Sequence, residues 1–100
     1  MRSVNYHPDA RAEFLHEIAY FAGLSVGLSE RFDRAVIAAE ALAAATPDRW
    51  PQYAHGTRRV MDKRFKFSLV YVHDEQSITV IAIAPFRRPP GYWSSRLNVG

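Results

Sequence analysis

Two short stretches of alternating apolar residues constrain the fold of this chain more than any other feature. Apolar side chains occupy every second position in residues 65–71 and again in residues 78–84, with a polar interval between them. They are Phe65, Phe67, Leu69 and Tyr71, followed by Ile78, Val80, Ala82 and Ala84. A period of two is typical of β-strands, and the polar interval indicates a turn. We therefore expect a β-hairpin with one buried face and an opposite face, carrying Lys66 and Ser68, that is open to a ligand.

The residues before this hairpin predict one short strand and two helices. Pro8 ends a strand of residues 3–6 and suits the first turn of a helix. The apolar face of this helix comprises Ala10, Phe14, Ile18, Phe21 and Ala22, and its acidic face, which we expect to be solvated, comprises Asp9, Glu13 and Glu17. Residues 23–27, with a glycine at each end, predict a loop. Residues 28–45 then predict a second helix, which ends before Pro47.

Together these elements predict one domain with an α+β fold. The order is β-α-α-β-β-β, in which an antiparallel sheet packs against an N-terminal helical hairpin, and the later strands cover residues 58–61, 64–72 and 78–84. A length of 100 residues suits a single core, so we expect residues 1–100 to form one domain. With 48% hydrophobic and 23% charged residues, the chain has the composition of a folded protein.

Composition also excludes several kinds of site. The chain has no cysteine, which excludes disulfides and thiolate nucleophiles and fits a reducing cytoplasm. Its four histidines are scattered, so we expect no metal site, and the absence of a glycine-rich phosphate loop predicts no nucleotide cofactor. No apolar run approaches the roughly 20 residues that span a bilayer, and no basic leader precedes one. We expect a cytoplasmic protein without membrane contact.

Positive charge is concentrated in the C-terminal part of the chain. Residues 1–56 contain five Lys and Arg against seven Asp and Glu, whereas residues 57–100 contain eight against three. A field of this kind attracts an acidic protein or a polyanion. The segment after the hairpin adds aromatic residues to the arginines, with Arg87-Arg88 followed by Tyr92-Trp93 and Arg96. Such a segment resembles a nucleic-acid contact, although Tyr92 and Trp93 would equally well cover the edge of the sheet.

Several segments, taken in their order and spacing over about ninety residues, resemble the RelE/ParE toxin superfamily. They are Val4–Arg11, Gly27–Phe32, Pro47 with Trp50-Pro51, Arg58-Arg59, Arg64–Tyr71, Ile81–Ala84, Arg87-Arg88-Pro89 and Tyr92-Trp93. The resemblance implies the toxin of a bacterial type II toxin–antitoxin pair, which its antitoxin wraps with a helix and an extended segment. RelE-like members are ribosome-dependent messenger-RNA endonucleases. ParE-like members act on DNA gyrase without such a catalytic set.

The sequence departs from the nuclease pattern at three places. Ser68 stands where RelE-like enzymes carry an arginine, Pro85 stands where many relatives have a histidine, and Pro89 lies near the second catalytic arginine. Tyr92 and Trp93 lie near the catalytic tyrosine of the family. These departures make the chain more similar to the ParE-like branch, so we expect a toxin that binds its target. A messenger-RNA endonuclease, or a degenerate relative that only binds antitoxin, remains the alternative.

Two overlapping sets of residues are therefore candidates for function. Metal-free RNA cleavage needs cationic groups around the phosphate and a proton donor, although no general base is apparent in the sequence. The catalytic candidates, if the chain is a nuclease, are Arg64, Lys66, Arg87, Tyr92 and Arg96. The candidates for binding antitoxin or target are Arg58, Arg59, Arg64, Arg87, Arg88, Tyr92 and Trp93.

Overall fold

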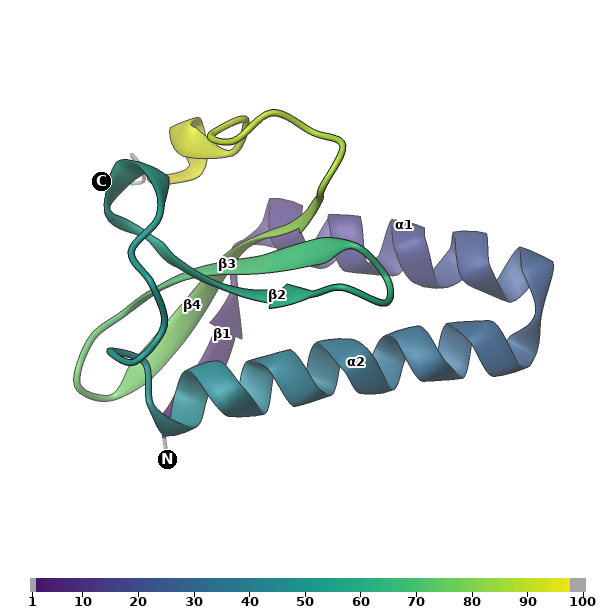
Figure 1. Ribbon diagram of the computed structural model, residues 1–100, viewed down its shortest axis with the longest axis horizontal. Coiled ribbons are helices and arrows are strands. Elements are labelled where there is room, and N and C mark those ends of the chain that lie inside the picture. The colour runs from purple at the N-terminus through teal and green to yellow at the C-terminus, as the bar shows by residue number, and fades with distance from the viewer. Residues whose placement is uncertain (1, 98–100) are drawn as a thin grey trace.

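Four strands and two long helices follow one another in the predicted order. A computed structural model describes residues 2–97. Its elements are β1 (Ser3–Tyr6), α1 (Pro8–Leu24), α2 (Val26–Ala45), β2 (Arg58–Asp62), β3 (Phe67–His73) and β4 (Ser77–Pro85), with short 3₁₀ turns at Ala54–Gly56 and Ser94–Leu97. The arrangement confirms the α+β fold class with its N-terminal helical hairpin, which lies along one face of the sheet and projects beyond its end (Figure 1).

The sheet is mixed, because its first strand runs parallel to its last. The strand order is β1-β4-β3-β2, so β4 is an inner strand with β1 on one side and β3 on the other. The β2–β3 and β3–β4 pairs are antiparallel, as expected, whereas β1 pairs with β4 in parallel from Ser3 opposite Ser77 to Tyr6 opposite Val80. Parallel neighbours need a long crossover. Here the helical hairpin and two further strands provide it.

A single residue, Ser25, connects the two helices. Its N–H donates to the carbonyl of Phe21 at the end of α1, and its side-chain oxygen accepts from the N–H of Leu28 in the first turn of α2. One residue thus caps both helices, and the predicted loop of residues 23–27 is wrong. Gly27 lies inside α2, so helical geometry continues through a position where glycine suggested a break.

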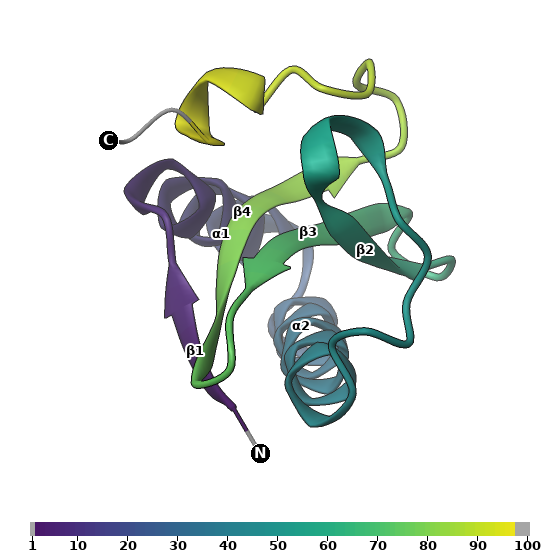
Figure 2. The ribbon, with the colours of Figure 1, turned by 90° about the vertical axis from the view of Figure 1, so that its left-hand side faces the viewer.

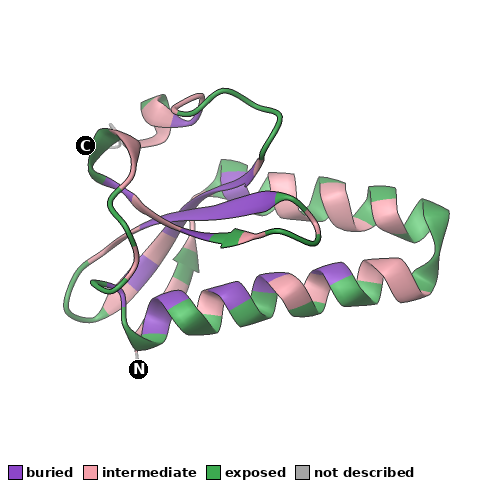
Figure 3. Cartoon of the chain, in the orientation of Figure 1, coloured by how far each residue is buried: buried purple, intermediate pink, exposed green. Residues whose placement is uncertain are grey.

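An aromatic cluster fills the core between the helices and the sheet. Phe32 of α2 is only 2% exposed and its ring packs within 6.1 Å, centroid to centroid, of four other rings. These rings belong to Phe14, Phe21, Phe65 and Phe67. In Figure 3, buried residues line the sheet-facing side of α2 and the middle of the sheet, whereas α1 contributes mainly half-buried residues to this core. This core holds the hairpin to the sheet through apolar burial.

A β-bulge at Ile81 changes which side chains of β4 face the helices. Val70 pairs with Ala82 and Tyr71 pairs with Val80, so Ile81 has no partner in β3. Val80 belongs to the helix-side core, whereas Ala82 and Ala84 belong to a second apolar cluster on the other face. An extra residue in one strand reverses the alternation beyond it. The expectation that residues 78–84 present one continuous apolar face is therefore wrong.

The second apolar cluster means that both faces of the sheet are covered. The chain after β4 folds back over the sheet (Figure 2). Trp93, only 1% exposed, belongs to the same buried cluster as Val70 and Ala82. Tyr53, from the loop before β2, packs against the same cluster. The expectation of one face open to a ligand is therefore wrong over this part of the sheet, and the structure favours the interpretation in which Trp93 covers it.

Strand β3 begins at Phe67, three residues after the predicted start. The turn before it is fixed by Asp62, whose carboxylate accepts a hydrogen bond of 2.7 Å from the N–H of Phe65. Lys66 then adopts a positive φ of 58°, which is incompatible with an extended strand. Arg64 and Lys66 consequently lie on an exposed turn rather than within the sheet.

Candidate functional site

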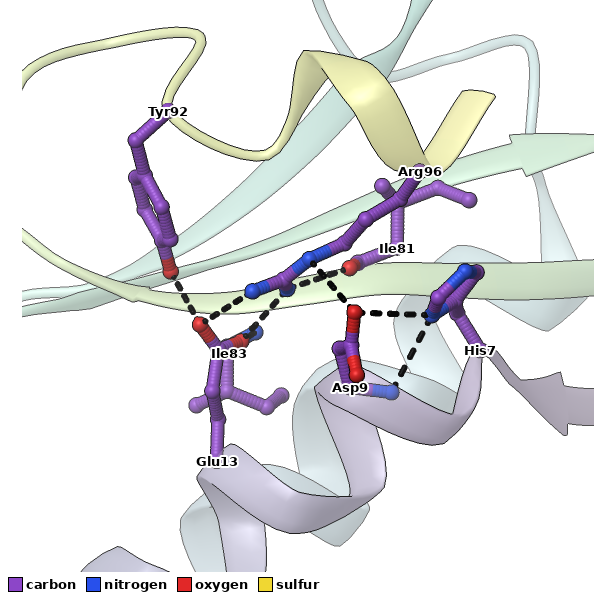
Figure 4. Close-up of polar contacts among 7 residues, drawn as sticks. All are labelled: His7, Asp9, Glu13, Ile81, Ile83, Tyr92 and Arg96. Atoms are coloured by element: carbon purple, nitrogen blue, oxygen red, sulfur yellow. Dashed lines mark hydrogen bonds and ion pairs between the residues drawn. The ribbon is translucent and has the colours of Figure 1, made fainter. Parts of the chain in front are cut away.

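A half-buried ion pair fastens the C-terminal segment to the first helix. Glu13, in the second turn of α1, accepts hydrogen bonds of 3.0 Å from both terminal nitrogens of Arg96 and one of 2.6 Å from the Tyr92 hydroxyl. The backbone N–H of Ile83 donates to the same carboxylate at 3.1 Å, and Arg96 also donates to the carbonyl of Ile81 at 3.0 Å. Figure 4 shows these contacts, which join α1, β4 and the C-terminal turn. We call Glu13, Tyr92 and Arg96 the C-terminal clip.

The start of α1 adds a weaker charge to the clip. The carboxylate of Asp9 lies 3.8 Å from the Nε of Arg96, at a site where its own side chain remains largely in solvent. His7 caps the helix by accepting a hydrogen bond from the N–H of Asp9 at 3.1 Å. The acidic face expected to be solvated therefore supplies two partners for one arginine. Of these, only Glu13 has a carboxylate withdrawn from water, with 18% of its side chain exposed.

The clip leaves Tyr92 and Arg96 poorly suited to proton transfer. Burial, reinforced by the hydrogen bond to the Glu13 carboxylate, raises the pKa of Tyr92 above its usual value. Burial disfavours the charged form of Arg96, but the hydrogen bonds to Glu13 outweigh it and raise the pKa of Arg96. A tyrosine that already donates to a carboxylate, and an arginine that already forms a bidentate pair, have their hydrogen-bonding groups occupied within the fold.

The other binding candidates occupy different environments. Arg58 is half-buried and donates to the backbone carbonyl of Trp50 at 2.5 Å, which fixes the loop before β2. Arg59 lies over the ring of Tyr53, and Arg88 lies over the ring of Tyr92, at 4.0 and 3.7 Å from the ring centroids. Within residues 2–97, neither of these two guanidinium groups forms a salt bridge. Trp93, by contrast, is a core residue of the C-terminal segment, and its ring is buried between that segment and the sheet.

A groove of about 540 Å³ lies between α1, the start of β3 and the end of β4. Its floor is apolar and belongs to the aromatic core, including Phe21, Phe65 and Phe67. Lys66, on the turn before β3, and Arg87, just after β4, line one side of it, and His16 and Glu17 line it from α1. Tyr20 and Phe86, which are 58% and 44% exposed, also line the groove. We call this the helix–sheet groove.

The groove brings together candidates that the sequence placed far apart and residues that it did not single out. Lys66 and Arg87 were expected as cations, and the fold places them in one groove. His16 and Glu17 were not proposed for chemistry, because a helical histidine and a stripe of acids resemble a solvated face. Glu13 was missed for the same reason. No local signal marks it, because its partners follow about eighty residues later.

Neither models of known protein families nor curated protein sequences match this chain. Among residues 2–97, no three His, Cys, Asp or Glu side chains are grouped closely enough to hold a metal ion. No helix within the same residues is long and apolar enough to cross a membrane. The functional assignment therefore depends on the geometry described above and on the resemblance in the sequence.

Proposed function

We propose that this chain is the toxin of a bacterial type II toxin–antitoxin pair, ParE-like in its mode of action, and works in the cytoplasm. It inhibits growth by binding a cellular target, DNA gyrase, and a cognate antitoxin neutralises it in a hetero-oligomer. The fold agrees with the architecture that the resemblance implies, but fold alone does not determine function. The choice between binding and cutting depends on the state of particular side chains.

The observation that carries this proposal is the C-terminal clip. A superfamily nuclease would use a tyrosine and arginines near the C-terminus, and here Tyr92 and Arg96 are both hydrogen-bonded to Glu13. Ser68, which stands in place of a nuclease arginine, is buried at 3% exposure. A residue engaged in holding the fold together has little freedom to stabilise a reacting phosphate. The arrangement supports a protein that presents surfaces to partners.

The helix–sheet groove offers a surface on which an antitoxin segment can dock. Its aromatic floor fits one bulky apolar side chain, and Lys66 and Arg87 provide positive charge for carboxylates on the same segment. An amphipathic helix or extended segment with an apolar anchor next to Asp or Glu has this chemistry. We propose that the antitoxin occupies this groove, with its acids toward Lys66 and Arg87.

The partnership is tested by expressing the chain with and without the small acidic protein encoded beside it. The proposal predicts growth arrest by the chain alone, relief on co-expression, and a complex that remains intact through size-exclusion chromatography. Failure of the two proteins to associate, together with no relief of toxicity, would refute the pairing. Normal growth with a folded, antitoxin-free chain would instead support the degenerate relative that binds antitoxin without being toxic.

One observation favours a second candidate function, a ribosome-dependent messenger-RNA endonuclease. The helix–sheet groove places an imidazole and a carboxylate, from His16 and Glu17, in the same groove as Lys66 and Arg87. These types of group can take a proton from a 2′-hydroxyl and stabilise a phosphate. This candidate predicts new messenger-RNA 5′ ends within minutes of induction. It further predicts that His16→Ala and Arg87→Ala abolish those ends while the chain stays folded by circular dichroism.

A further inference from the structure

A second, smaller pocket lies on the face of the sheet opposite the helices. Its volume is about 190 Å³, and most of the side chains around it are apolar. They include Met61 of β2, Ala84 of β4, Phe86 and Pro89 beyond it, and the buried Trp93. Phe86 and Met61 are 44% and 48% exposed, so part of the apolar wall remains in contact with water. A concave, apolar and partly open site of this size fits a single side chain.

Two arginines provide positive charge at this pocket. Arg59 and Arg88 both line it, and each guanidinium lies over an aromatic ring, at 4.0 Å from Tyr53 and 3.7 Å from Tyr92. Stacking on a ring orients the guanidinium plane and leaves the N–H groups at its edge free to donate. Neither arginine forms a salt bridge within residues 2–97. No Asp or Glu among these residues lines the pocket.

A buried hydroxyl adds a further polar group. Thr57 and Ser68 are the buried polar side chains among residues 2–97, and the Thr57 hydroxyl donates to the carbonyl of Ala54. Ser68, at 3% exposure, instead lines the pocket between Met61 and Ala84, its neighbours on the adjacent strands. The site therefore combines two oriented guanidinium groups and one hydroxyl with an otherwise apolar wall.

We propose that this pocket binds the C-terminal residue of a partner peptide, with an apolar side chain against the wall and the terminal carboxylate toward Arg59 and Arg88. A carboxylate has two oxygens in a plane, which match the parallel N–H groups of a guanidinium fork. The α-carboxylate and side chain of one residue are also close enough to share a small pocket. A phosphate fits less well, because it is more strongly hydrated and this wall supplies few donors. This site shares Pro85 and Phe86 with the helix–sheet groove but lies on the opposite face of the sheet, and the proposal makes no use of the occupant of the groove.

The test uses the purified chain and a five-residue peptide that ends in leucine with a free carboxylate. Calorimetry should give saturable binding, and the same peptide with a C-terminal amide should bind at least about tenfold more weakly. Arg59→Gln and Arg88→Gln should each weaken binding of the free-acid peptide by about tenfold, whereas Arg34→Gln, an exposed control on α2 outside the pocket, should change it by less than about twofold. The comparison of acid with amide needs no variant, so it stays informative if an arginine variant unfolds.

Three results would overturn the proposal. The first is equal binding of the acid and amide peptides, or no binding of the acid up to millimolar concentration. The second is tighter binding of a mononucleotide than of the peptide, measured by displacement of the peptide, because this would identify a phosphate site. The third is an affinity for N-acetyl-leucine as high as that for the peptide, because this would identify a small-molecule site rather than a peptide terminus.

Discussion

The carboxylate of Glu13 accepts hydrogen bonds of 3.0 Å from both terminal nitrogens of Arg96, across eighty-three positions of sequence. The two side chains are only 18% and 14% exposed, so water screens their attraction weakly. The Tyr92 hydroxyl and the N–H of Ile83 donate further hydrogen bonds to the same carboxylate. This pair determines where the C-terminal segment lies.

The first prediction concerns the stability that the pair provides. Glu13→Gln removes the charge that compensates the half-buried Arg96, so the free energy of unfolding should fall by about 2 kcal/mol. Glu17→Gln is the matched control, one turn later on the same helix, and should change it by less than about 0.5 kcal/mol. Urea denaturation followed by circular dichroism measures both. Equal effects of the two substitutions would show that the pair contributes nothing specific.

A second prediction concerns alkaline pH. Burial raises the pKa of Tyr71 to about 12, and the Tyr71 hydroxyl donates to the carbonyl of Pro47 at 2.7 Å. Because the folded-state pKa lies above the unfolded value of about 10, the contribution of Tyr71 is complete below pH 10 and is lost as the pH rises toward 12. Through Tyr71 alone, the free energy of unfolding should be about 1.4 kcal/mol lower at pH 11 than at pH 8.

Two other tyrosines add to the loss of stability at alkaline pH. Tyr6 donates a hydrogen bond to Glu40, and burial raises the pKa of Tyr6, as it does that of Tyr92. Tyr71→Phe should therefore flatten the dependence of stability on pH above 10 without removing it. Urea titrations between pH 8 and pH 11 measure the slope, and an unchanged slope in Tyr71→Phe would contradict the assignment.

The third prediction concerns the layer formed by the C-terminal segment. Trp93→Ala removes the largest side chain of the second cluster and should lower the free energy of unfolding by about 4 kcal/mol. Hydrogen exchange should then accelerate at Val70 and Ala82, which Trp93 covers, more than at Leu69 on the helix side. Uniform acceleration across the sheet would indicate global destabilisation instead of local release of this layer.

The fourth prediction concerns the helix–sheet groove. The double substitution Lys66→Glu and Arg87→Glu reverses the charge of the two cations that line the groove. It should weaken antitoxin binding at least about a hundredfold and increase the rate at which the antitoxin dissociates. Ile37→Glu is the control, because Ile37 is 53% exposed on α2 and does not line the groove. Surface plasmon resonance gives both rates. Weakening by Ile37→Glu to the same extent would place the antitoxin on the outer face of the hairpin.

The elements of this fold were predictable from the sequence because each depends on local periodicity. Details that depend on one residue or on distant partners were not. The bulge at Ile81 reverses the alternation within an apolar run, and every residue from Val80 to Ala84 is apolar, so the sequence does not reveal the reversal. The one-residue connection at Ser25 was hidden by two glycines that suggested a longer loop. In both cases tertiary contacts decided between local alternatives.

The candidate site was only partly predictable, for a related reason. The sequence identified Arg59, Arg87 and Arg88 by their charge, and the fold places the guanidinium groups of Arg59 and Arg88 over aromatic rings. It could not show that Arg96 and Tyr92 are satisfied internally, because that depends on a glutamate on a helix far earlier in the chain. Residues whose types suggest catalysis, such as Tyr92 and Arg96, can therefore serve to hold the fold together.

The measurement that tests the central proposal most directly is a gyrase supercoiling assay with the purified chain, run beside RNA-end mapping after pulse expression. A ParE-like toxin should inhibit supercoiling in proportion to its concentration, the antitoxin should restore it, and RNA ends should stay unchanged. Full gyrase activity at saturating toxin, together with new messenger-RNA ends on ribosomes, would contradict the account.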